Sequence, residues 1–193
     1  MATGGMPEMV FEYILKEHGI DPENDVAIDQ SIDFGSTAAA FSEGKGDYTI
    51  EFEPAATILE EEGKGVVVAS LGTDSGFVPY TAFCAKQSFI EDHPDVIQSF
   101  TNALQKGMDY VETHSPEEIA KTIAQQFPET DLATITKIVN RYDEQDTWKS
   151  DLIFEKESFD LLCDILRSGG ELSKEPDYER LVTTTFAKHA KND

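Results

Sequence analysis

The segment "DYTIEFEPAATILEEEGKGVVVASL", residues 47–71, indicates a strand, a helix and a second strand in succession. Its first part alternates Tyr48, Ile50 and Phe52 with polar residues, which is typical of a strand with one buried and one solvated face. The stretch "EPAATILEEEG" then favours a helix, and the apolar run "GVVVASL" is typical of a strand covered on both faces. We therefore predict an α/β fold class with a partly parallel sheet and crossover helices.

The flanking segments extend this pattern in both directions. Upstream, the sequence predicts a helix that has Pro7 in its first turn and ends at Gly19. A short strand at residues 25–29 and a small helix opened by Ser36 are expected to follow. Downstream, "VPYTAFCA" predicts one more strand, over residues 78–85.

The rest of the chain reads as successive helices. Pro94 opens a long helix with apolar residues at intervals of three and four, and Ser115 with Glu118 predicts a capping box at the next helix. Further helices are expected at residues 131–142, 155–167 and 178–188. We therefore divide the chain into an α/β part, residues 1–88, and a helical part, residues 89–193.

The charge of the chain limits its partners. Fifteen Lys and Arg stand against 38 Asp and Glu, so the formal net charge is −23. Nucleic-acid phosphates and anionic membrane surfaces would be repelled by most of such a surface. No apolar run approaches the roughly 18 residues of a membrane span, and the opening "MATGGMPEM" lacks the features of a signal peptide. We expect a globular protein that does not bind nucleic acid.

Catalytic and metal-binding patterns are absent from the sequence. It has no "GxSxG" and no "HExxH", and its histidines are expected at the surface near helix ends. Cys84 and Cys163 lie in apolar stretches, which favours two buried free thiols over a disulfide or metal pair. Glu51 and Glu53 share a strand face, but an ordinary solvated face explains them better than paired acid–base catalysis. We predict no catalytic residues, no metal, no cofactor and no enzyme activity.

The segment "TGGMPEM", residues 3–9, has two interpretations. The first turn of a helix carries backbone N–H groups without internal partners, and glycines would leave them open to an oxyanion. Alternatively, Gly4 and Gly5 are a leader, Pro7 is an ordinary first-turn proline and Glu8 is a favourable first-turn charge. No lysine follows, so the segment is not a nucleotide-binding loop of the Walker type.

Five segments in order across residues 4–190 resemble one family. It comprises the substrate-binding proteins of ABC importers of the nitrate, sulfonate and taurine type. The closest branch contains thiamine-pyrimidine binding and synthesis proteins. The segments are "GGMPEMVFEYILKEHGIDPENDV", "AFSEGKGDYTIEFEPAATILEEEGKG", "VPYTAFCAKQSFIEDHPDVIQSFTNALQKGMDYV", "HSPEEIAKTIAQQFP" and "RYDEQDTWKSD".

The resemblance implies a two-lobed clamshell of the type II periplasmic-binding-protein kind, which closes around a small ligand and presents it to a membrane permease. Residues 1–88 would belong to one ligand-binding lobe, and residues 89–193 would pack on the hinge and the other lobe. By this comparison the sequence is N-terminally truncated and lacks most of the first lobe and its export leader. Full-length members act outside the cytoplasm. The surface left by the missing lobe would favour self-association.

The resemblance assigns ligand binding to seven residues, which are Gly4, Gly5, Met6, Pro7, Glu53, Tyr80 and Thr81. The glycine segment would form a helix start facing the cleft, and Glu53 would point into the same crevice from the end of its strand. Tyr80 would offer a stacking face and Thr81 a hydroxyl near the hinge. Trp148 is expected to be a packing anchor instead.

The ligand expected at these residues is a small polar molecule. No arginine stands beside them in the sequence, so an uncharged or cationic ring, such as a thiamine-precursor pyrimidine held by Tyr80 and Glu53, fits better than a sulfonate or nitrate. The alternative function is an enzyme of the thiamine-pyrimidine synthesis type, but the chain has no segment rich in cysteine and histidine. A truncated reading frame without function also stays open.

Overall fold

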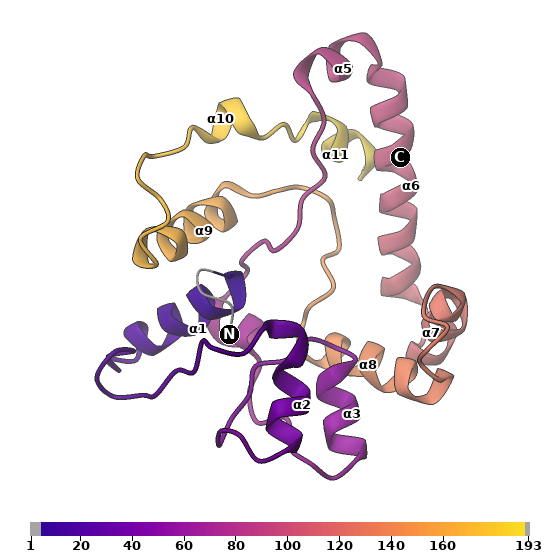
Figure 1. Ribbon diagram of the computed structural model, residues 1–193. Helices are drawn as coiled ribbons and strands as arrows, with labels where there is room; N and C mark the ends of the chain where they lie inside the picture. The colour runs from indigo at the N-terminus through magenta and orange to yellow at the C-terminus, as the bar shows by residue number, and fades with distance from the viewer. Residues whose placement is uncertain (1–4, 192–193) are drawn as a thin grey trace.

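The computed structural model describes residues 5–191, and its regular elements are helices (Figure 1). They are α1 (Met6–Glu17), η1 (Phe34–Ser36), α2 (Thr37–Ser42), α3 (Ala55–Glu61), α4 (Leu71–Ser75), α5 (Gln87–Asp92), α6 (Pro94–Thr113), α7 (Pro116–Ile123), η2 (Ala124–Gln126), α8 (Leu132–Glu144), α9 (Lys156–Ser168), α10 (Tyr178–Leu181) and α11 (Thr185–Ala190).

Helix α1 begins and ends as its sequence predicts. Pro7 lies in the first turn, where its missing N–H group costs no internal hydrogen bond. At the other end Gly19 adopts φ 74°, a left-handed conformation that glycine enters without steric penalty. The N–H group of Ile20 then donates to the carbonyl of Leu15 at 2.9 Å, which closes the helix.

The predicted strands do not form within residues 5–191, which corrects the α/β interpretation. Residues 25–29, 47–53, 65–70 and 78–85 form no strand, and within the described chain no backbone hydrogen bond joins one of these segments to another. An alternating pattern favours extended backbone and two faces, but a strand also needs a neighbour about 4.8 Å away. Residues 5–191 do not supply that neighbour, so the sheet is missing here.

The second half is helical, as predicted. Pro94 opens the 20-residue helix α6, and Ser115 and Glu118 form the expected capping box at α7. The helix predicted over residues 178–188 is instead two short helices. Val182 between them is extended, at φ −118° and ψ 131°. The β-branched run that starts there disfavours a continuous helix.

Two separate apolar clusters hold the helices together. The first joins α1 to α9 through Met9, Val10, Ile14 and Ile165. The second joins α7 to α8 and contains Ile119, Ala120, Ile135 and Val139. Figure 1 shows α6 along one side of the molecule, with α11 packed against it. Helix α8 also contacts α3, and α9 contacts α1, so within residues 5–191 the helical part packs directly on the part that precedes it.

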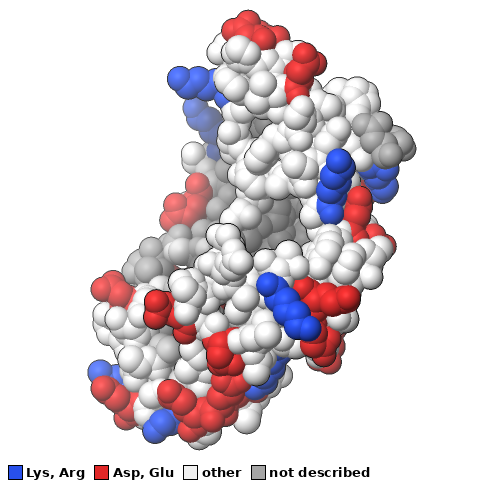
Figure 2. All heavy atoms as spheres, turned by 90° about the vertical axis from the view of Figure 1, so that its right-hand side faces the viewer, with Lys and Arg blue, Asp and Glu red and all other residues white. Residues whose placement is uncertain are grey.

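The molecule exposes more surface than a compact chain of its mass. The accessible area is 12815 Å², whereas a folded monomer of 21.4 kDa exposes roughly 9,100 Å². Figure 2 shows many of the acidic side chains on this face gathered over the lower part of the molecule. Among the most exposed apolar side chains are Val66, Val68, Phe77 and Phe83. Within residues 5–191, no helix is both long and apolar enough to cross a bilayer.

Asp151 stabilises the fold in a pH-dependent way. Burial alone would raise the pKa of its carboxyl, but hydrogen bonds from Lys191 and Lys149, with the N–H group of Ile153, lower that pKa from 3.8 to about 2. The Lys191 and Lys149 amines lie 2.7 and 2.9 Å from the carboxylate oxygens. A lowered pKa means that the stabilisation is present above about pH 4 and is lost as the pH falls towards 2.

Replacing Asp151 with asparagine is therefore expected to lower the free energy of unfolding by about 1–2 kcal/mol near pH 6, because both lysines are half-exposed and partly screened. The difference from the wild type should shrink between pH 4 and pH 2. Urea unfolding across this pH range measures it. Asp160→Asn, which removes an exposed ion pair with Lys156, is the control. A constant difference down to pH 2 would contradict this assignment.

Candidate functional site

A pocket of about 210 Å³ lies at the N-terminal end of α1. Its lining consists of Gly5, Met6, Pro7, Glu8, Phe34, Phe52 and Tyr80. Gly5, Met6, Pro7 and Tyr80 were singled out from the sequence, and the structure brings them together from segments more than 70 residues apart. Their ligand-binding role stays a prediction.

Aromatic rings form one wall of the pocket. Phe52 packs edge-to-face against Phe34, with ring centroids 5.0 Å apart, and against Tyr80 at 5.5 Å. Such pairs favour a fixed relative orientation of the rings. Tyr80 is 60% exposed and Phe52 is 45% exposed, so part of each ring is available at the surface. The wall offers apolar faces to a flat molecule.

The start of α1 also lines the pocket. Gly5 is the N-cap residue and provides no side-chain cap for the first-turn N–H groups. Glu8 lies in that first turn, is only 4% exposed, and accepts a hydrogen bond at Oε1 from the Gln30 side chain. A first-turn carboxylate is favourable for the helix because the N-terminal end is partially positive.

Glu53 does not line this pocket, although it follows Phe52 directly. Its Oε1 accepts from Nη1 of Arg141 at 2.6 Å, and its Oε2 accepts from the N–H group of Thr57 at 3.0 Å. The Glu53 side chain is 7% exposed. The expectation of a solvated strand face is therefore wrong for Glu53, because an ion pair and a bond to α3 bury it.

Arg141 is the residue that the sequence analysis missed. It lies on α8 and also donates to Thr57 Oγ1, at 3.1 Å, and to the Glu60 carboxylate. Burial would lower the pKa of the Arg141 guanidinium, but the hydrogen bonds with Glu53 and Glu60 raise it. Arg141 stands beside Glu53 in space despite a separation of 88 residues. The quoted segment "RYDEQDTWKSD" starts with it, but the sequence contains no local signal for the pairing.

Tyr142 and Trp148 extend this cluster. Burial raises the pKa of the Tyr142 hydroxyl, as does the nearby charge of Glu53, whereas a hydrogen bond with the Glu53 backbone lowers it. Trp148 packs edge-on against Tyr142, with ring centroids 5.4 Å apart. The structure therefore places Trp148 in a packing contact with Tyr142, and Trp148 does not line the pocket.

Two further predicted residues remain. Gly4 lies outside the described residues. Thr81 is exposed on the irregular segment that follows Tyr80, and it does not line the pocket.

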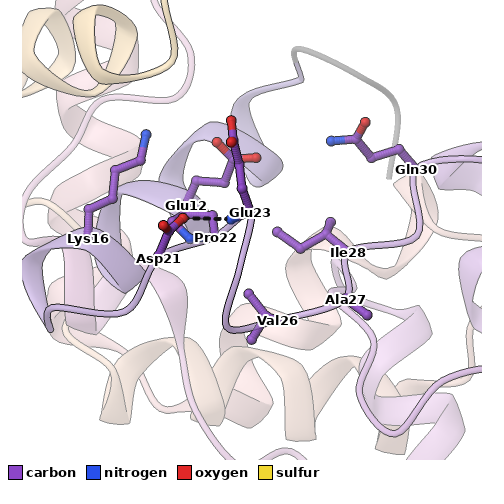
Figure 3. A pocket seen from close by; sticks show the side chains of 9 residues that line it. All are labelled: Glu12, Lys16, Asp21, Pro22, Glu23, Val26, Ala27, Ile28 and Gln30. Carbon is purple, nitrogen blue, oxygen red and sulfur yellow. Dashed lines mark hydrogen bonds between the residues drawn. The ribbon is translucent and has the colours of Figure 1, made fainter.

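A larger depression of about 550 Å³ lies beside the loop after α1 (Figure 3). Two of its charged side chains, Asp21 and Lys16, are engaged by hydrogen bonds. Asp21 accepts from the Glu23 N–H group at 2.9 Å, the dashed line in Figure 3, and from the Asn24 side chain at 2.7 Å. Lys16 donates to the Ser168 carbonyl at 3.0 Å. The depression has no aromatic wall, so we take the smaller pocket as the candidate site.

Reactive groups are sparse in the described part of the chain. Among residues 5–191, no group of three His, Cys, Asp or Glu is placed to hold a metal ion. Cys163 is buried, and burial raises the pKa of its thiol, which keeps it protonated. Cys84 is exposed, which corrects the expectation of a second buried thiol. Its segment is irregular and exposed, so its apolar neighbours do not enclose it.

Comparisons with known proteins show the family of this chain and one relative. Residues 1–127 match the NMT1-like family. Over 185 residues the chain is 41% identical to a protein of Bacillus subtilis (strain 168) named "Putative binding protein YtlA". That alignment covers 96% of this chain and 55% of the relative, so the chain spans about half the relative's length. No solved structure matches the chain significantly.

Proposed function

Because the chain belongs to the NMT1-like family, we propose that it is the solute-binding component of an ABC importer, or part of one. The pocket at the start of α1 would contact the ligand. The observation that carries this proposal is that Gly5, Met6, Pro7 and Tyr80, chosen from the sequence, line one pocket with two further aromatic residues. Binding without catalysis is also supported by the relative's name as a binding protein.

The chain would form about half of a two-lobed receptor. Its alignment with 55% of the relative and its large accessible surface both support this arrangement. In the complete protein a second lobe would close over the pocket. The receptor would act outside the cytoplasm and would pass the ligand to a membrane permease. This chain alone cannot exclude water from the ligand by closure, so we expect weaker binding than in the complete receptor.

The proposed ligand is a small polar molecule, and a thiamine-precursor pyrimidine suits the site better than a sulfonate or nitrate. The Phe52 and Tyr80 rings would stack on or border a flat ring. Arg141 does not change this preference, because its guanidinium is bound to Glu53 and Glu60 rather than lining the pocket.

Calorimetric titration of 4-aminopyrimidine, taurine and nitrate into this chain tests the proposal. We expect the pyrimidine to bind most tightly, and Tyr80→Ala to weaken it about tenfold because an aromatic contact is lost. Tyr48→Ala is the matched control, since Tyr48 is 81% exposed and lies outside the pocket lining. Equal effects of the two substitutions would place the ligand elsewhere.

A further inference from the structure

The aromatic wall of the candidate pocket includes a residue that the core does not hold in place. Phe52 is 45% exposed and belongs to neither apolar cluster of the fold. Its ring meets those of Phe34 and Tyr80 edge-to-face, and Tyr80 is itself 60% exposed. Contacts between half-exposed rings do not fix a side chain as close packing in a core does. The orientation of Phe52 therefore depends on how its backbone is held.

The backbone around Phe52 has few bonds of its own. Within residues 5–191, one hydrogen bond between backbone groups involves residues 47–53, and in it the Ala56 N–H group donates to the Phe52 carbonyl at 3.2 Å. This bond connects Phe52 to the first turn of α3. Residues 47–51, which precede it, are irregular. The contacts that hold the start of α3 therefore also hold Phe52.

Glu53 connects the start of α3 to α8. Its Oε1 accepts from Nη1 of Arg141 at 2.6 Å, and its Oε2 accepts from the Thr57 N–H group at 3.0 Å. The same Nη1 donates to Oγ1 of Thr57, a fully buried residue, at 3.1 Å. Arg141 therefore closes a small network of hydrogen bonds at this end of α3. Neither Arg141 nor Glu53 belongs to the pocket lining.

This buried ion pair controls the peptide group that Glu53 shares with Phe52. The Glu53 and Arg141 side chains are 7% and 15% exposed. A buried carboxylate that loses its charged partner is strongly destabilised, so it gains by turning towards water. Because the peptide group between the two residues is planar, such a turn also moves Phe52. The ion pair can therefore fix the ring without touching a ligand.

We propose that Arg141 and Glu53 are positioning residues, which hold Phe52 in the pocket wall and so set the affinity of the pocket for a flat ring. This inference rests on the proposed function. It gives Glu53 a different role from the direct ligand contact that the family resemblance implies, because both Glu53 oxygens are already bonded within the protein.

Glu53→Gln and Glu60→Gln form a matched pair of variants, since both remove a carboxylate that binds Arg141. Glu53 follows Phe52 directly, whereas Glu60 lies near the far end of α3. 4-Aminopyrimidine is titrated into the full chain and followed by ligand-observed NMR, with each variant shown to be folded by circular dichroism. We expect Glu53→Gln to weaken binding about fivefold, which is less than the roughly tenfold loss expected from removing the ring. Glu60→Gln should change the affinity far less.

A double-mutant cycle with Phe52→Ala tests whether the pair acts through the ring. If Arg141 and Glu53 position Phe52, Glu53→Gln should have no further effect once the ring is absent. A direct contact between Glu53 and the ligand, or a general loosening of the fold, would instead weaken binding by the same factor in both backgrounds. Arg141→Lys should behave as Glu53→Gln does, because a single amine cannot replace the fork of the guanidinium.

The outcomes separate this inference from the proposed function. An unchanged affinity in Glu53→Gln or in Phe52→Ala, equal losses in both backgrounds, or an equal loss in Glu60→Gln overturns the positioning role and leaves the binding pocket intact. Failure of 4-aminopyrimidine to bind the wild type overturns the pocket, and the inference with it. If Glu53→Gln does not fold, Arg141→Lys decides the matter in the same two backgrounds.

Discussion

Replacing Arg141 with glutamine is expected to lower the free energy of unfolding by about 2–3 kcal/mol, because the change leaves the buried Glu53 carboxylate without its charged partner. The Arg141 and Glu53 side chains are 15% and 7% exposed, so water does not readily replace the lost contact. Glu60 loses a bond at the same time, although Lys137 remains 3.3 Å away. Urea unfolding at neutral pH measures the loss.

Arg167→Gln is the matched control for this prediction. Arg167 also pairs with two carboxylates, those of Asp164 and Glu175, but its side chain is 48% exposed. Exposed ion pairs contribute little to stability, so this variant should unfold almost as the wild type does. Similar losses in the two variants would mean that burial of Arg141 does not matter.

We also expect the isolated chain to self-associate through its uncovered apolar surface, and to do so more strongly in salt. The accessible area of 12815 Å² is about 40% larger than that of a compact monomer. Exposed apolar patches of this kind usually mark contact sites. The net charge of −23 opposes association at low ionic strength, and salt screens that repulsion.

Sedimentation at increasing concentration and ionic strength measures this association, which should raise the average mass above 21.4 kDa. A variant with Val66→Ser, Phe77→Ser and Phe83→Ser should stay closer to the monomer mass, since these side chains are each 75% exposed and are not part of either apolar cluster. A single monomeric mass at high salt and high concentration would refute the expectation.

Local signals predicted the helices well. The Pro7 start, the Gly19 stop and the Ser115 capping box each depend on a few neighbouring residues, and each is present. The strands were predicted from a pattern that is equally local, but pairing depends on a partner segment. Within residues 5–191 that partner is absent, so segments such as 65–70 are extended and unpaired.

The candidate site was predicted only in part, because some of its contacts also depend on residues far apart in the sequence. The helix start carried a local signal and Tyr80 was assigned by the family resemblance, and both line the same pocket. Glu53 was assigned to the ligand cleft by resemblance, because the sequence gives no sign that its partner lies 88 residues away, on α8. Glu8 was weighed only as a first-turn charge, since the sequence does not reveal which side of α1 faces Phe52 and Tyr80.

The bond between Arg141 and Glu53 also determines when the pocket wall is anchored during synthesis of the chain. Phe52 and Tyr80 leave the ribosome well before α8, but Glu53, next to Phe52, acquires its partner only after Arg141 has emerged. Closing so long a loop is entropically costly and slow compared with forming a helix. The nascent protein therefore secures the aromatic side of its pocket only after α8 has emerged.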